Sequence, residues 1–146
     1  MFKKILYPTD FSDISKKALE YIKKLKGAGA KEIVLLHVID EREIEKFSQY
    51  AKPYLDVEEI EKDNEENIRQ EMKDLENQLR ESGFSVKSRI EKGIPFKDIL
   101  RVEKEEKVSV LVMGSHGKSC IEEMLLGSVS EKVVRKSSMP VLVIRR

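Results

Sequence analysis

Short apolar runs rich in Val and Ile alternate along this chain with longer stretches that are apolar at helical spacing. Four runs are almost continuously apolar, which is typical of strands that are buried on both faces of a sheet. They occupy residues 5–7, 33–39, 108–113 and 141–144. Residues 85–91 form the least apolar strand candidate, so we expect this strand at an edge of the sheet.

Helices are predicted between the strands. One apolar stripe consists of Ile14, Ala18, Leu19, Ile22 and Leu25, and another of Ile68, Met72, Leu75 and Leu79. Ser12 is expected to cap the first of these helices, and Gly83 to end the second. Pro95 suits the first turn of a helix that continues to residue 106, and residues 128–136 form a short last helix.

Strands that alternate with helices imply right-handed crossovers and a parallel sheet covered on both faces. We therefore predict an α/β fold with a five-stranded, doubly wound parallel sheet, and the length of 146 residues suits a single domain over 1–146. Residues 41–64 fit neither pattern, because they are strongly charged and contain Pro53. We interpret them as a partly helical insertion over the functional site or over a neighbour, although such charge runs more often form a solvated face.

The overall charge is balanced, with 28 basic and 27 acidic residues, so no broad basic surface predicts binding to nucleic acid. No apolar run approaches the length of a membrane span, and no membrane association is expected. Cys120 is the single cysteine, which excludes an intramolecular disulfide and suits a small residue near a ligand loop better than a redox role. A cytoplasmic location is expected.

Glycines follow the fourth predicted strand at a defined spacing: Gly114-Ser115-His116-Gly117, then nine residues, then Gly127-Ser128. Glycine lets backbone N–H groups approach a ligand closely, and such groups are suited to phosphate oxygens. The pattern is not a Walker A loop, which has four residues between its first glycine and the Gly-Lys pair where this chain has two. Gly27-Ala28-Gly29 closes a helix and does not match the dinucleotide fingerprint.

The Gly-x2-Gly-x9-Gly-Ser spacing, with Pro8-Thr9-Asp10 after the first strand and Leu36-His37-Val38 in the second, resembles the ATP-binding branch of the universal stress protein family. The resemblance extends from Ile5 to Ile144. It implies a Rossmann-like fold, similar to the adenine nucleotide alpha hydrolases, with strand order 3-2-1-4-5. It also implies ATP as the ligand, with Mg or Mn; AMP and cyclic nucleotides are alternatives.

Ligands of an open parallel sheet bind beyond the strand ends where the strand order reverses. With the implied order, this crevice lies between the first and fourth strands, so that Asp10 faces the glycine segment. Asp10 is expected to accept ribose hydroxyls or to reach a metal through the phosphates, and its alternative role is to cap the first helix. Gly114 is expected against the ribose, and Gly117 is expected to let its loop approach the phosphates.

The last helix supplies the other half of the expected phosphate site. The free N–H groups of Gly127, Ser128 and Val129 are predicted to hold phosphate oxygens, and the hydroxyls of Ser128 and Ser130 to add donors. The resemblance adds that the backbone near Asp10 and Val38 recognises the adenine edge and that Met113 packs beside the nucleotide. The full predicted set is Pro8, Thr9, Asp10, Val38, Met113, Gly114, His116, Gly117, Gly127, Ser128, Val129 and Ser130, with the metal ligands unknown.

His116, His37 and Lys118 each have two possible roles. His116 is expected to contribute its backbone rather than a general acid or a metal ligand. His37 is expected to be a core histidine with satisfied hydrogen bonds. Lys118 either pairs with a phosphate or is solvated.

Two functions are compatible with this site. The first is a nucleotide-regulated binding module that responds to stress and acts on an unknown protein partner. The alternative is a slow Mg- or Mn-dependent ATP hydrolase, although the glycine pattern lacks a Walker A lysine and a second acidic motif. A homodimer is also expected through the apolar last strand, Val141, Leu142, Val143 and Ile144, because an exposed strand edge favours pairing with a second copy.

Overall fold

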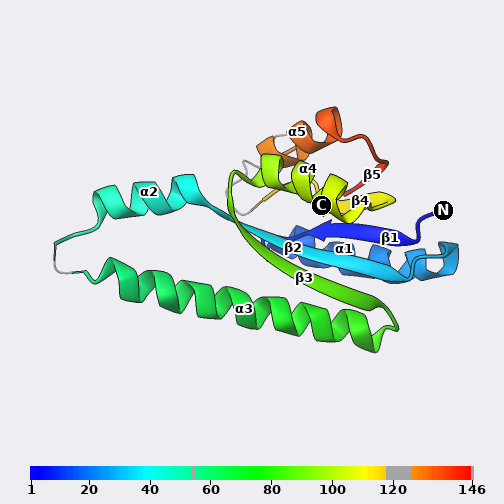
Figure 1. The fold of residues 1–146 in the computed structure, drawn as a ribbon, viewed down its shortest axis with the longest axis horizontal. Helices are drawn as coiled ribbons and strands as arrows, with labels where there is room; N and C mark the ends of the chain where they lie inside the picture. Colours follow the sequence, from blue (N-terminus) through cyan, green and yellow to red (C-terminus); the bar gives the residue numbers. More distant parts are fainter. Residues whose placement is uncertain (54, 118–125, 146) are drawn as a thin grey trace.

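The computed structural model describes residues 1–53, 55–117 and 126–145. The strands are β1 (Lys4–Pro8), β2 (Glu32–Asp40), β3 (Ser85–Gly93), β4 (Val110–Gly114) and β5 (Val141–Ile144). They form one sheet in the order β3-β2-β1-β4-β5, and every neighbouring pair is parallel (Figure 1). The fold class and strand order are confirmed, and β3 lies at an edge as expected.

Helices cover both faces of the sheet. They are α1 (Asp13–Leu25), α2 (Glu41–Tyr50), α3 (Val57–Glu81), α4 (Pro95–Glu106) and α5 (Ser128–Lys136), with a short 3-10 helix η1 (Lys26–Ala28) after α1. The buried residues of α1 and α3 pack on one face, and those of α4 and α5 pack on the other. Within the described residues, no helix has the length and apolar character needed to cross a membrane.

Local signals in the sequence set the helix ends. The Ser12 hydroxyl accepts a hydrogen bond from the Ser15 N–H at 3.2 Å and caps α1, as predicted. Pro95 occupies the first turn of α4. Gly83, which follows α3, has a φ of +92°, a conformation that glycine adopts at little cost.

The central strand β1 contributes to both halves of the core. Ile5 and Tyr7 pack toward α1 and α3, whereas Leu6 packs toward α4 and α5. All three side chains are fully buried. The expectation of burial on both faces is wrong for β5, because Leu142 is 38% exposed at the second edge of the sheet.

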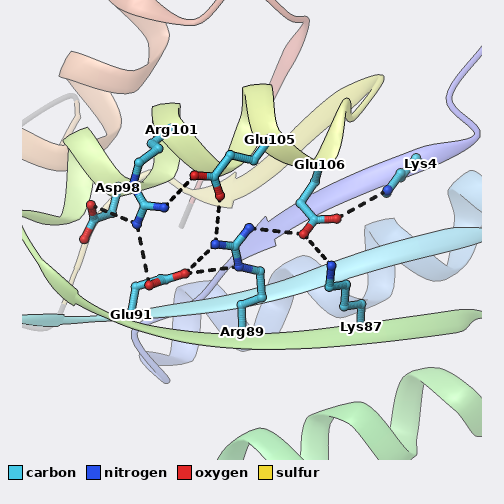
Figure 2. A network of polar contacts seen from close by, with 8 residues as sticks. All are labelled: Lys4, Lys87, Arg89, Glu91, Asp98, Arg101, Glu105 and Glu106. Carbon is cyan, nitrogen blue, oxygen red and sulfur yellow. Dashed lines mark hydrogen bonds and ion pairs between the residues drawn. The ribbon is translucent and has the colours of Figure 1, made fainter.

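A network of charged side chains joins β3 to α4 and to the start of β1 (Figure 2). The Glu106 carboxylate, which is 8% exposed, accepts hydrogen bonds from Lys87 Nζ at 2.7 Å, Arg89 Nη1 at 3.1 Å and Lys4 Nζ at 3.5 Å. These bonds, that from Lys87 above all, hold the pKa of Glu106 below its ordinary value. The network thus holds the edge strand β3 to α4.

Replacing Glu106 with Gln should lower the free energy of unfolding by about 2 kcal/mol at neutral pH, because Lys4, Lys87 and Arg89 lose a charged acceptor that is itself only 8% exposed. The depressed pKa means that the carboxylate contributes fully above the ordinary Glu pKa of about 4.3, and that this contribution is lost as the pH falls through the lower folded-state pKa. Urea denaturation of both proteins should therefore show a difference that shrinks in acid.

The matched control is Glu66→Gln, at an exposed carboxylate that forms no ion pair within the described residues. Its unfolding free energy should change little. A Glu106→Gln difference that stayed constant from neutral to acid pH would contradict the role of this charge.

Candidate functional site

A pocket of about 980 Å³ opens at the carboxyl ends of β1, β2 and β4. Its lining includes all twelve residues of the predicted set: Pro8, Thr9, Asp10, Val38, Met113, Gly114, His116, Gly117, Gly127, Ser128, Val129 and Ser130. β1 pairs with β2 over five residue pairs but with β4 over only two. The ends of β1 and β4 are therefore not joined by ladder hydrogen bonds, and the pocket forms where the strand order reverses.

The turn from β1 into α1 is held by buried hydroxyl groups. Thr9 Oγ1 accepts hydrogen bonds from the Phe11 N–H at 3.1 Å and from Ser15 Oγ at 2.7 Å. The Tyr7 hydroxyl donates to Ser15 O at 2.6 Å, and burial raises the pKa of Tyr7, so that this donor stays neutral. Phe11 has a φ of +64°, an uncommon conformation for a large side chain, which the surrounding bonds maintain.

Asp10 lies in this turn, on the wall of the pocket. Its Oδ1 accepts a hydrogen bond from the Ser12 N–H at 3.0 Å, but the residue that caps α1 is Ser12, so the alternative role of Asp10 as the cap is wrong. A Cβ atom on Gly117 would lie 2.9 Å from Asp10 Oδ2. The absence of a side chain at Gly117 therefore lets the β4 loop approach the Asp10 carboxylate.

The other two glycines of the pattern bring backbone segments together. A Cβ atom on Gly114 would lie 3.0 Å from Ile14 Cγ2 and 3.2 Å from the Ser15 nitrogen, so this glycine allows α1 to pack against β4. From the sequence, Gly114 is expected to contact a ribose. In the structure, the close approach of α1 explains why residue 114 is a glycine. A Cβ atom on Gly127 would lie 3.3 Å from both Ser115 O and His116 Cα.

The N-terminus of α5 faces the pocket and begins after Gly127. The prediction of a free Gly127 N–H is wrong, because this group donates to Ser115 O at 2.7 Å. The prediction for the Ser130 hydroxyl is also wrong, since it donates to Gly114 O at 2.8 Å and is buried. The N–H groups of Ser128, Val129 and Ser130 occupy the first turn, where the helix offers them no acceptor. With the helix dipole, they form a site suited to an anion.

Both histidines line the pocket. His37 is half-buried, its Nδ1 lies 2.7 Å from Thr9 O, and its ring stacks on Phe11 with the centroids 4.6 Å apart. It was expected in the core, and its position on the pocket wall was missed. His116 is 8% exposed, and its Nδ1 lies 2.6 Å from the Ser115 hydroxyl oxygen. The His116 side chain is thus held against its own loop.

A second wall of the pocket comes from the insertion and from the part of α3 that follows it, and its residues were not predicted individually. Its polar lining residues are Arg42, Glu43, Asn64, Asn67, Gln70 and Glu71. The Asp40 carboxylate caps α2 and binds the Arg42 guanidinium at 2.9 and 2.8 Å, and this contact holds the pKa of Asp40 below its ordinary value. The spacing of 64, 67 and 71 on one helical face was the available signal.

These groups fit a nucleotide. Backbone N–H groups of α5 suit phosphate oxygens, the Asp10 carboxylate suits hydroxyl groups or a divalent cation bound to phosphates, and Met113 and Val38 offer apolar surface to a base. Within the described residues, no three His, Cys, Asp or Glu side chains gather into a metal site. Asp10 with phosphate oxygens is the ligand set that suits magnesium best. Lys118 and Cys120 lie outside the described residues.

Known proteins are similar to this chain in sequence and in fold. Residues 1–145 match the model of the Universal stress protein family. The chain is 44% identical to Universal stress protein MJ0577 of Methanocaldococcus jannaschii, over 100% of this chain and 96% of the relative. It is 36% identical to Universal stress protein YxiE of Bacillus subtilis, over 99% and 100%. The solved structure of MJ0577 superposes with a TM-score of 0.88 over 100% of this chain and 97% of that one.

These matches span nearly all of the chain and include the strands, the glycine segment and the start of α5. The resemblance inferred from the spaced glycines is therefore confirmed by the whole sequence and by the fold. The chain belongs to the universal stress protein family.

Proposed function

We propose that this chain is an ATP-binding universal stress protein that acts in the cytoplasm as a nucleotide-regulated binding module. ATP occupies the pocket at the switch point of the sheet, which is the place between β1 and β4 where the strand order reverses. Its phosphates lie at the N-terminus of α5 and its base beside Val38 and Met113. Asp10 contacts the ribose or a Mg²⁺ or Mn²⁺ ion held by the phosphates. The output is the occupancy of the site, which alters a surface that a partner protein contacts.

One observation carries the proposal: the pocket at the end of the sheet is lined by all twelve residues of the predicted set. The segment around Asp10 and the segment that holds Gly117 and Ser128 are far apart in the sequence and meet there. Their chemistry is an anion-binding helix end, a carboxylate and apolar surface, which together match a nucleotide. Universal stress proteins have been solved with AMP, from Arabidopsis thaliana, and with cAMP, so both ligands are competitors to test against ATP.

A homodimer through β5 is part of the proposal. Leu142 is 38% exposed in the single chain, and β5 is the terminal strand of the sheet. Its unpaired backbone groups can pair antiparallel with the same strand of a second copy about a two-fold axis. Such pairing closes both edges and limits the assembly to two chains.

The Gly117→Val variant should bind ATP at least tenfold more weakly than the wild type, a loss of about 1.4 kcal/mol. The physical reason is that a branched side chain would meet the Asp10 carboxylate, since even a Cβ atom would lie 2.9 Å from Oδ2. Isothermal titration with ATP and Mg²⁺ measures the affinity. Circular dichroism checks the fold, and AMP and cAMP are titrated in parallel.

Gly27→Val is the matched control, because a Cβ atom at Gly27 would have no neighbouring atom within 4 Å. It should leave the ATP affinity unchanged. Equal ATP affinity of the Gly117→Val, Gly27→Val and wild-type proteins would contradict the assignment of the nucleotide site to this pocket.

Asp10→Asn should weaken ATP binding about tenfold and abolish most of the effect of Mg²⁺ on the affinity, because the amide keeps an oxygen for the Ser12 N–H but loses the charge. Asp13→Asn, at an exposed position in the first turn of α1, is the control. Titrations with Mg²⁺ and with a chelator separate the two roles. If the Asp10→Asn affinity retained the wild-type response to Mg²⁺, the carboxylate would be assigned to the ribose alone.

Leu142→Asp should convert a dimer into a monomer in sedimentation equilibrium at micromolar concentration, because the charge would be buried at the strand interface. Tyr21→Asp is the control, since Tyr21 is 39% exposed and Leu142 38%. A monomeric wild-type protein, or a Leu142→Asp protein that stays dimeric, would exclude this interface.

A further inference from the structure

Residues 41–66, here called the arm, comprise α2, its connection and the start of α3. No described residue of the arm is buried: α2 has none, and the buried residues of α3 begin at Ile68. In Figure 1, α2 and the N-terminal end of α3 extend past the strands, on the left of the view. A ten-residue helix that buries no side chain gains little stability from its own domain. The arm is thus a surface suited to contact another molecule.

The arm exposes large apolar side chains. Phe47 is 40% exposed, Tyr50 82%, Leu55 39% and Ile60 38%. These are four of the ten exposed large hydrophobic residues of the described chain, although the arm is less than a fifth of its length. Exposed apolar side chains that are concentrated in one segment suit contact with another protein, whereas scattered ones need no explanation.

The arm is also acidic, although the chain as a whole is nearly neutral. Residues 41–66 contain ten acidic and four basic residues, which leaves 17 acidic and 24 basic residues in the rest of the chain. Of those ten carboxylates, Glu65 alone forms an ion pair within the described residues, with Lys92 at 2.7 Å. The acidic excess of the arm favours a positively charged partner.

The base of the arm forms part of the pocket. Arg42, Glu43 and Asn64 line it, and Asp40 joins the end of β2 to the start of α2 by capping that helix and binding Arg42. A ligand in the pocket therefore lies against the base of the same element whose far end exposes Phe47 and Tyr50.

We infer that the arm is a docking surface for a positively charged amphipathic segment of a partner protein, and that the ligand in the pocket alters the affinity of this surface. The effect of the ligand on this surface rests on the proposed function. Phe47, Tyr50 and Ile60 supply apolar contact area, and the surrounding carboxylates supply attraction and orientation toward Lys and Arg side chains. The charge complementarity favours this occupant over an acidic or a neutral one.

The first test uses a defined probe. A labelled synthetic helical peptide with Leu on one face and Lys on the others is titrated by fluorescence anisotropy, beside a copy with Glu in place of Lys. The Lys peptide should bind and the Glu peptide should not. The triple variant Phe47→Ser, Tyr50→Ser, Ile60→Ser should bind the Lys peptide at least tenfold more weakly. Because these side chains are exposed, its fold should be retained, which circular dichroism checks.

The control is Tyr21→Ser combined with Val134→Ser, two exposed apolar positions outside the arm. It should bind the Lys peptide like the wild type. Equal peptide affinity of the arm variant and this control would overturn the docking surface. The wild type could instead associate with itself in a salt-dependent way that the arm variant loses. This result would show that the arm binds a second copy of the chain, and it would overturn the proposal of a separate partner protein.

The second test separates this inference from the proposed function. ATP with Mg²⁺ should change the peptide affinity of the wild type but not of Gly117→Val. Peptide binding that depends on the arm but does not respond to bound ATP would overturn the link while the docking surface stands. Peptide binding that depends on the arm in a protein that binds no ATP would support the surface and contradict the proposed function alone.

Discussion

The reversal of strand order around β1 is the constraint on which the rest of the structure depends. β1 has β2 on one side and β4 on the other, and its ladder with β4 is only two residue pairs long. The connection that follows β1 leads to α1 on one face of the sheet, and the one that follows β4 leads to α5 on the other face. Neither connection therefore fills the space between the ends of the two strands. Asp10 and Gly117 meet across that space, and the N-terminus of α5 faces it. The pocket is a consequence of parallel topology before any side chain is considered.

Close approach of backbone segments gives this pocket its shape. Gly114 allows α1 against β4, Gly127 sits against the loop at Ser115, and Gly117 sits against Asp10. Each contact would be tight or blocked with a Cβ atom present. At the ends of β1 and β4, the groups that face a ligand are mostly the backbone N–H groups of α5 and the Asp10 carboxylate, which suit recognition of phosphates and hydroxyls more than covalent chemistry.

Much of the fold followed from pattern, since the apolar runs gave the strands and Ser12, Gly83 and Pro95 gave helix ends. The strand order came from the family resemblance, because periodicity holds no information on which strands are neighbours. The roles of Gly114 and Ser130 were not predictable, because both depend on tertiary contacts, with α1 for the glycine and with Gly114 O for the hydroxyl. The contribution of Asn67, Gln70 and Glu71 to the pocket wall was not predicted, because helical spacing shows that polar residues share a face but not what that face contacts.

An NMR titration of ¹⁵N-labelled protein with ATP and Mg²⁺ tests the central claim most directly, because each backbone amide reports on its own surroundings. A nucleotide at the proposed site should cause the largest shift changes at the amides of Asp10, Gly117, Ser128 and Val129, with smaller changes at Val38 and at Arg42 in the base of the arm. Shift changes confined to other parts of the chain, or no changes at saturating ATP, would contradict a nucleotide site at the switch point of the sheet.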